Sequence, residues 1–281
     1  MKKSKNLLTV IALCLIGTGL LTCTGVMAVL GFDFTRLDNS VYVESTYEFS
    51  QKITDIVIDI STSDIKILPS ADSKAKVICY EDEDDKHVTS VQNGTLTITK
   101  AKKEWYEYLK LGFNFRSPDI TIYLPQSNYD SIKIDNSTGD TFIDSINAKN
   151  INIECSTGDI TLNNLEAFGI NLEASTGDIE LNNLTAHNMD MEVSTGDMDI
   201  NHTTCSGSME LEASTGDITF NYSDAKAITA ETSTGHITGT LLTAKSFFAD
   251  TSTGVIDVPR TTGDRCELET STGNIRISVA E

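Results

Sequence analysis

The chain has 281 residues and a formal net charge of −20, from 41 acidic and 21 basic side chains. Such a balance excludes nucleic acid as the main ligand, since binding there depends on Lys and Arg neutralising phosphates, and it disfavours an anionic lipid surface. With 4 Pro, 10 Phe and 8 Tyr, the composition does not indicate disorder.

The N-terminus predicts a membrane segment. Residues 1–6 form a basic tail with Lys2, Lys3 and Lys5, and residues 7–32 contain no charged side chain. A helix of that length crosses a hydrocarbon core of about 30 Å. The basic tail predicts cytoplasmic residues 1–6, a transmembrane signal-anchor over 7–32 and a linker over 33–44. The chain is therefore expected in the cell membrane as a single-pass protein with its C-terminal domain extracytoplasmic.

Two other fates of this segment stay open. Val26-Met27-Ala28 offers a small-residue site for cleavage of a signal peptide, although the apolar run exceeds the usual 7–15 residues of such peptides. Lipidation would use Cys23, but Thr22 is a poor fit to the small residue expected before it. All three fates leave the rest of the chain outside the cytoplasm.

The C-terminal half is an internal repeat. Ser-Thr-Gly recurs at a spacing of 19 residues, with one step of 20, starting at Ser137, Ser156, Ser175, Ser194, Ser214, Ser233, Ser252 and Ser271. A fixed period of this size is typical of solenoids and other repeat architectures.

Each repeat predicts two short strands and a tighter third side. Apolar residues alternate before the motif, as in Ile151, Ile153 and Cys155, which predicts a half-buried strand. After the motif the phase changes, so a corner is needed, and its Gly can adopt φ > 0. The motif Thr is expected to face inward. Asn pairs such as Asn163-Asn164 predict a second bend, and the third side carries small apolar pairs: Leu165 and Ala167, Leu184 and Ala186, Leu242 and Ala244.

A single coil of this size cannot bury its apolar face, but stacked coils can pair each strand in parallel with its equivalent. The predicted fold is all-β, a single-stranded parallel β-helix (β-solenoid) with ~19 residues per coil. A right hand is favoured because left-handed β-helices show a hexapeptide period that is missing here. Residues 136–281 are the regular repeats.

Residues 45–135 are predicted to be irregular first coils or a cap. Ser61-Thr62-Ser63-Asp64 precedes Ser137 by four periods and has matching apolar flanks. Between them, Gly94–Ile98 and Asp119–Ile122 are interpreted as degenerate corners. Glu81–Asp85 and Trp105–Leu111 are interpreted as insertions or a cap.

These Ser-Thr-Gly-Asp-Ile repeats, preceded by Ile120-Thr121-Ile122-Tyr123-Leu124-Pro125, resemble the bacterial DUF4097 family of adhesin-like proteins. The resemblance covers roughly residues 45–281. It implies a β-strand-repeat fold and supplies no catalytic residues. The chain departs from the pattern near its end, where His236, Val255 and Asn274 replace the Asp.

An acid stands two residues before every motif Ser. These residues are Asp135, Glu154, Glu173, Glu192, Glu212, Glu231, Asp250 and Glu269. They are predicted to face solvent with carboxylates about 5 Å apart, although like charges opposed across strands are destabilising. The column is either a solubilising wall that discourages aggregation or a binding face for a cationic partner, with Lys133 as its one obvious counter-charge.

A second acidic column follows the corner Gly and consists of Asp140, Asp159, Asp178, Asp197 and Asp217. One interpretation is turn chemistry, in which each carboxylate accepts backbone N–H bonds. The other is a Ca²⁺ site, since hard cations take oxygen ligands. The nonapeptide of Ca²⁺-binding β-rolls is absent, which disfavours Ca²⁺.

Catalysis has little support in the sequence. Cys79, Cys155, Cys205 and Cys266 are scattered, with no His at ligand spacing, and are expected to be buried apolar residues. His87, His187, His202 and His236 have no Ser or Cys with a distinctive setting nearby. No cofactor and no catalytic residue is predicted.

The sequence therefore predicts a non-catalytic, membrane-anchored solenoid of a bacterial cell envelope, acting as an adhesin-like scaffold or envelope-stress module. Its partner would be a cationic peptide, a cell-wall component or a protein. A carbohydrate-active β-helix enzyme and a Ca²⁺-stabilised rod are the alternatives. The open end of the solenoid also predicts end-on self-association.

Overall fold

The computed structural model describes residues 2–29, 31–32, 41–83, 85–101 and 118–281. The described helix and the described strands belong to two separate compact units. Trp105–Leu111 and most of the predicted linker lie outside the described residues.

The first unit contains helix α1 (Lys2–Val29). Within it, Ile11–Val29 is long and apolar enough to cross a membrane, with a mean hydropathy of 2.0; a signal sequence passes the same test. Thr18, Thr22 and Thr24 donate their hydroxyl hydrogen bonds to carbonyls one turn back in the helix. The polar atoms of these side chains are thus satisfied within the helix, as an apolar environment requires.

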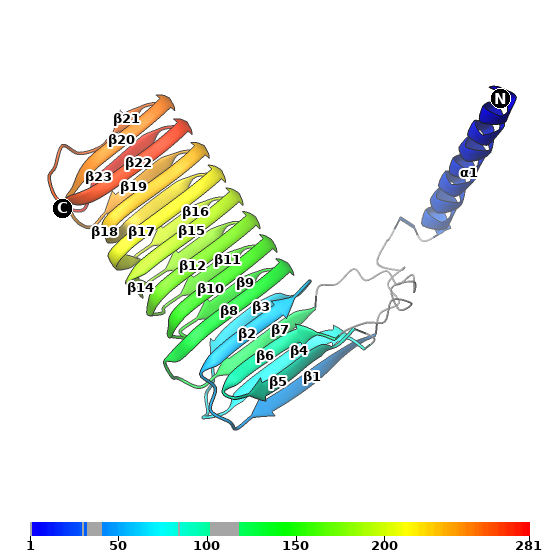
Figure 1. Ribbon diagram of the computed structural model, residues 1–281, viewed down its shortest axis with the longest axis horizontal. Helices are drawn as coiled ribbons and strands as arrows, with labels where there is room; N and C mark the ends of the chain where they lie inside the picture. Colours follow the sequence, from blue (N-terminus) through cyan, green and yellow to red (C-terminus); the bar gives the residue numbers. More distant parts are fainter. Residues whose placement is uncertain (1, 30, 33–40, 84, 102–117) are drawn as a thin grey trace. The chain divides into compact units, whose positions relative to one another are not determined.

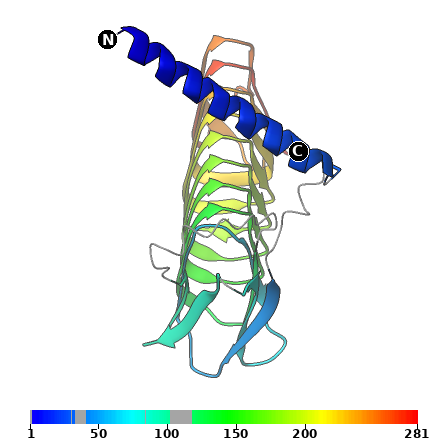
Figure 2. The ribbon, with the colours of Figure 1, turned by 90° about the vertical axis from the view of Figure 1, so that its right-hand side faces the viewer.

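The second unit is all β and winds into a nearly closed solenoid of two facing sheets (Figures 1 and 2). In spatial order, sheet 1 contains β5 (His87–Gln92), β6 (Thr95–Lys100), β2 (Asp55–Ile60), β8 (Tyr129–Thr138), β10 (Ala148–Thr157), β12 (Ala167–Thr176), β15 (Asn188–Thr195), β17 (Thr204–Thr215), β18 (Ile218–Thr234), β22 (Asp264–Thr272) and β20 (Lys245–Thr253).

Sheet 2 lies opposite and shares the long strand β18. It contains β1 (Tyr42–Phe49), β4 (Ala75–Asp82), β7 (Asp119–Leu124), β3 (Asp64–Pro69), β9 (Thr141–Asp144), β11 (Ile160–Asn163), β13 (Ile179–Asn182), β16 (Met198–Asn201), β18, β19 (Ile237–Leu241), β23 (Ile275–Val279) and β21 (Ile256–Asp257). The short β14 (Thr185–Ala186) pairs with β17 on the third side.

The alternating apolar residues of neighbouring coils stack in register, as predicted. Ile151 of β10 lies beside Ile132 of β8 and Ile170 of β12, in parallel. The inward residues of both sheets form one continuous buried core. Parallel stacking of equivalent positions therefore hides the apolar faces that one coil alone would expose.

The first corner is built by the motif Gly, and the predicted positive φ is confirmed. Gly177 has φ of 139°, and a Cβ there would collide with the carbonyl oxygen of Gly158 in the neighbouring coil. The expectation that the motif Thr faces inward is wrong, because every copy is exposed. The last inward position is one residue before the Ser, where the Thr232 hydroxyl donates to the carbonyl of Gly216.

The second bend is also confirmed. Asn164 and Asn183 have φ of 52° and 58°. The amide of Asn183 donates to Oδ1 of Asn164 at 3.1 Å, so the turn residues also link neighbouring coils. Leu165 and Leu184 fill the third side, but the predicted pair Leu242 and Ala244 is exposed, because the chain leaves the regular path there.

The N-terminal coils are not stacked in sequence order. β2 and β3 pair directly with β8 and β9, so the predicted four-period register is correct but no coil lies between them. β6 and β7 lie on their outer side. The interpretation of Gly94–Ile98 as a corner is wrong: Asn93 and Gly94, both with positive φ, form the tight turn of the antiparallel hairpin β5–β6. β4, which contains Glu81, is a regular strand and not an insertion.

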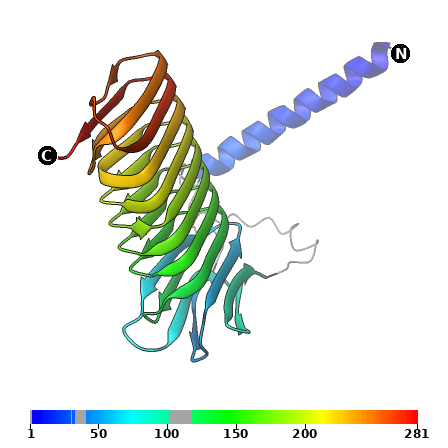
Figure 3. The same cartoon turned by 60° about the vertical axis from the view of Figure 1, so that its left-hand side comes forward.

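The C-terminal coils are also interleaved. The last coil in sequence, β22 and β23, pairs on one side with β18 and β19 and on the other with β20 and β21. In Figures 1 and 3, the orange strands β20 and β21 accordingly lie beyond the red ones. The outermost coil therefore consists of residues 245–257, not of the residues at the C-terminus.

Candidate functional site: an acidic column on sheet 1

The predicted acids lie in one line across sheet 1. Glu154 pairs in register with Asp135 and Glu173, Glu192 pairs with Glu173 and Glu212, and Glu231 pairs with Glu212 and Glu269. Asp250 pairs with Glu269, so the spatial order at the end differs from the sequence order. We call this line of side chains, with Asp59, the acidic column.

Asp59 extends the acidic column by one strand, because it pairs with Asp135. Sequence reasoning did not include it, although the alignment of Ser61 with Ser137 places Asp59 two residues before the corresponding Ser. The signal was present in that alignment.

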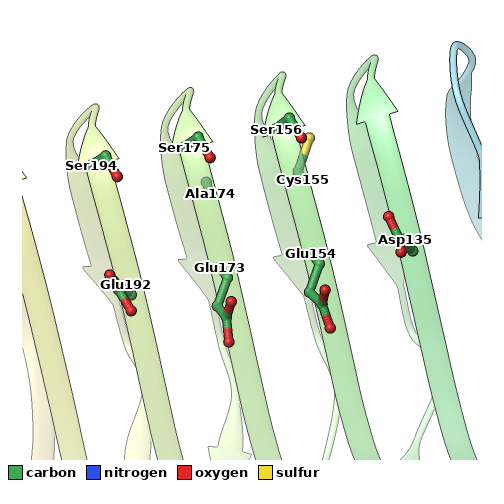
Figure 4. Close-up of a pocket in the computed structure, with 9 residues that line it drawn as sticks. All are labelled: Asp135, Glu154, Cys155, Ser156, Glu173, Ala174, Ser175, Glu192 and Ser194. Atoms are coloured by element: carbon green, nitrogen blue, oxygen red, sulfur yellow. The ribbon is translucent and has the colours of Figure 1, made fainter.

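The strands hold these carboxylates in water. Each acid lies between two inward residues, as Glu173 lies between Leu172 and Ala174, and alternation points it away from the core. All members are exposed except Glu154, which is half-buried. Figure 4 shows Asp135, Glu154, Glu173 and Glu192 side by side on neighbouring strands.

A shallow hollow of about 210 Å³ lies along the middle of the acidic column. Its lining consists of Asp135, Glu154, Glu173, Glu192, the motif residues Ser156, Ser175 and Ser194, and Cys155 and Ala174 (Figure 4). Carboxylates and hydroxyls are hydrogen-bond acceptors for an ammonium or guanidinium group. The hollow has room for such a group and none for a folded domain.

The acidic column is electrostatically unfavourable as it stands. The pKa of Glu231 is raised by partial burial and then by the charges of Glu269 and Glu212. Because neighbouring strands lie about 4.8 Å apart, these carboxylates repel one another. Among the described residues, the cation bridging to a column acid is Lys133, whose Nζ lies 4.0 Å from Oε1 of Glu154. The acidic column is thus largely uncompensated.

The second predicted column has a structural role. Oδ1 of Asp159 accepts the backbone N–H of Asp178 at 2.8 Å, and Oδ1 of Asp178 accepts that of Asp197 at 2.8 Å. In the same way, the Oδ1 of each Asp accepts the backbone N–H of the equivalent residue in the next coil along the whole series Asp64, Asp140, Asp159, Asp178, Asp197, Asp217 and His236. This is the turn chemistry expected for these residues, and we call the series the Asp ladder. A Ca²⁺ role for Asp140, Asp159, Asp178, Asp197 and Asp217 stays a prediction.

The departures from Asp are explained by the coil order. Nδ1 of His236 accepts the N–H of Asn274, and Oδ1 of Asn274 accepts the N–H of Val255. Val255 belongs to the outermost coil, beyond which no described residue needs an acceptor. His and Asn continue the ladder, and Val ends it.

The four cysteines after α1 are buried, as predicted. The sequence has no His at ligand spacing from a Cys, but the fold brings His87 close to Cys79 and Glu81. The sequence signal is the order Cys79, Glu81, His87, but β4 lies in sheet 2 and β5 in sheet 1, so the signal could be recognised only once the two sheets faced each other. The other three buried cysteines have no such cluster among the described residues.

Comparison with known proteins agrees with the fold. A "putative adhesin" from Bacteroides fragilis is 19% identical, with a TM-score of 0.58 over 84% of this chain and 97% of that one. A "putative lipid binding protein" from Parabacteroides distasonis is 16% identical, with a TM-score of 0.53 over 85% and 97%. At these identities the likeness establishes the fold alone. No curated protein matches the sequence.

The family follows from a broader match. The model of the family Toastrack DUF4097 matches residues 53–244, well over half of the chain. This range includes strands of both sheets, from β2 to β19, most of the acidic column and the whole run of Asp140, Asp159, Asp178, Asp197 and Asp217. The chain therefore belongs to the Toastrack DUF4097 family.

Proposed function

We propose that this chain is a non-catalytic, membrane-anchored module of a bacterial cell envelope that binds a cationic partner through the acidic column. The partner class is a basic peptide segment of a protein or a basic cell-wall component. The observation that carries the proposal is the unbroken line of exposed, mostly unpaired carboxylates on sheet 1 from β2 to β20.

Folding alone does not require the acidic column. The Asp ladder supplies the turn bonds, and the core supplies the burial, so the column acids are free for another role. Like charges at this spacing cost stability, and a bound cation would remove that cost. Adhesin-like or envelope-stress roles both fit such a face.

The anchor rests on α1. Its apolar side chains from Ile11 onward are almost all exposed, among them Leu13, Leu20 and Leu21. A helix that is apolar all round needs an apolar surrounding, which a bilayer provides. A retained anchor would place the solenoid outside the cytoplasm. We also infer ~19 residues per coil, supported by bonds between residues 19 positions apart. The right-handed winding that we infer rests on the missing hexapeptide period.

Deca-lysine binding to the full-length chain in detergent micelles tests the acidic column. Reversing Glu154, Glu173, Glu192 and Glu212 to Lys should abolish capture, whereas the wild type binds with strong salt dependence. A matched control reverses four exposed acids elsewhere and so changes the net charge equally: Glu166→Lys, Glu180→Lys, Asp199→Lys and Asp257→Lys. The control should bind like the wild type; unchanged binding by the reversed variant would contradict the proposal.

The open end supports a second kind of contact, end-on self-association. The outermost coil exposes Phe248, Val255 and Ile256 along strands β20 and β21, each paired on one side only. Such edges can pair with another chain. Sedimentation over a concentration series should show oligomers that Val255→Lys disperses; monomers throughout would refute this contact.

A further inference from the structure

A compact cluster of ligand-type side chains lies at the N-terminal end of the solenoid. Cys79 and Glu81 stand two residues apart on β4 and face the same way, and His87 begins β5. One ligand atom from each lies within 4.8 Å of the others. Cys79 and Glu81 are 0% exposed and His87 is 3% exposed.

The buried carboxylate of Glu81 lacks compensation. Its Oε2 accepts the backbone N–H of His87 at 2.6 Å and lies 2.7 Å from the ring Nδ1, but its Oε1 has no hydrogen-bond partner. Burial lowers the pKa of His87 more than the contact with Glu81 raises it, which favours the neutral imidazole. Nζ of Lys100, the nearby cation, is engaged by Asp85 at 3.0 Å. An unpaired oxygen of a buried carboxylate is costly.

We propose that Cys79, Glu81 and His87 form a binding site for a zinc-type divalent metal ion. Thiolate, carboxylate and neutral imidazole are the ligands that Zn²⁺ takes in proteins. The two anionic ligands balance the charge of the ion, which would leave the buried cluster neutral. Binding forms an S–metal bond and releases the thiol proton of Cys79 to solvent. Because the metal ion displaces that proton, its affinity should increase with pH.

The contacts of His87 with Ser63 support the assignment. Nε2 of His87 lies 3.2 Å from Oγ of Ser63, and that hydroxyl donates to the carbonyl of Thr62. If Nδ1 carries the proton, Nε2 faces an oxygen whose own hydrogen is directed elsewhere. If Nδ1 binds the metal, Nε2–H donates to Oγ of Ser63, whose hydroxyl in turn donates to the carbonyl of Thr62. Metal-bound His commonly donates its other N–H in this way.

The same three groups, Ser63, His87 and Glu81, are also the types found in a nucleophile relay. That role would need a substrate to reach Ser63, which is 0% exposed. Three protein ligands leave one coordination position for a water, and the burial of all three residues leaves a substrate no path to that position.

The test uses the full-length chain in detergent micelles, stripped with a chelator and titrated with Zn²⁺ or Co²⁺ alone. The wild type should bind a single ion per chain, melt at a higher temperature with Zn²⁺, and give thiolate-to-Co²⁺ charge-transfer absorption. Cys79→Ser should lose that absorption and bind Zn²⁺ about 100-fold more weakly or worse, exceeding the 10–100-fold typical of supporting residues.

The matched control is Cys266→Ser, which alters another cysteine of 0% exposure far along the chain and should keep the wild-type absorption. Far-UV circular dichroism confirms that each variant is folded. The measurement on the stripped wild type does not depend on any variant. The absence of both Co²⁺–thiolate absorption and a Zn²⁺-dependent melting shift would overturn the proposal, as would loss of the absorption in Cys266→Ser alone.

Discussion

At the scale of single residues, the Asp after each corner Gly acts as a connector between coils. Asp178 donates its N–H to the coil before and accepts the N–H of Asp197 from the coil after. The chemistry needs an acceptor atom and not a charge, which is why His236, through Nδ1, and Asn274, through Oδ1, can replace Asp. The side chain is short enough to reach the next backbone without bending the strand.

Replacing Asp178 therefore separates the two interpretations of these acids. Asp178→Ala should lower the free energy of unfolding by about 1 kcal/mol, or 2–4 °C in melting temperature, because an N–H loses its acceptor. Asp178→Asn keeps Oδ1 and should melt like the wild type. If these acids bind Ca²⁺ instead, Asp178→Asn should lower the melting temperature as much as Asp178→Ala does. The melting temperature of the wild type should then also respond to added Ca²⁺ or EDTA.

At the scale of elements, sheet 1 carries its acids at the expense of stability. The folded environment raises the pKa of Glu231 above its ordinary value of 4.5, through burial and the neighbouring acids. A raised pKa means that the folded state binds the proton more tightly. The favourable contribution is therefore present below about pH 4.5 and is lost as the pH rises through the raised pKa.

Glu231→Gln should accordingly stabilise the protein at neutral pH. We expect a gain on the order of 1–2 °C in melting temperature near pH 7 that disappears at about pH 4 and shrinks in high salt. Glu166→Gln, outside the acidic column, is the control and should show no such pH dependence. A gain that persists at low pH would mean that repulsion is not its source.

The sequence predicted the position of each side chain within a coil better than the order of the coils. The 19-residue period and the phase change at the Gly determine which residues face the core, so the acidic column and the corners could be located. The motif Thr was misplaced because the corner starts one residue earlier than the alternation suggests. Coil order was missed because every coil has the same apolar pattern: Ile275 pairs equally well with Ile237 and Ile256.

At the scale of the whole solenoid, a buried ion pair lies where the coil order is exchanged. Nζ of Lys245, at the start of the outermost coil, lies 2.6 Å from Oδ1 of Asp224 and also donates to the carbonyl of Ala225. The Lys245 side chain is 2% exposed. Because no other coil within the described part of the chain has an ion pair at this position, the pair distinguishes the interleaved order from simple stacking.

Lys245→Met should leave Asp224 buried without its partner and destabilise the terminal coils by about 3–5 kcal/mol. Hydrogen exchange should localise the loss to β20–β23. Adding Asp224→Asn, which keeps the acceptor for the N–H of Ala225, should recover most of the stability. If Lys245→Met is silent, or if the loss spreads evenly along the solenoid, the pair has no such role.

The central claim is that the acidic column is a binding face, and photo-crosslinking tests it most directly. Deca-lysine with a benzophenone group is bound to the full-length chain, irradiated, and the linked residues are identified by mass spectrometry. If the acidic column binds the ligand, crosslinks should concentrate on β8, β10, β12 and β15 around Glu154 and Glu173, and they should disappear in high salt. Crosslinks spread equally over sheet 2, or unaffected by neutralising the column, would contradict it.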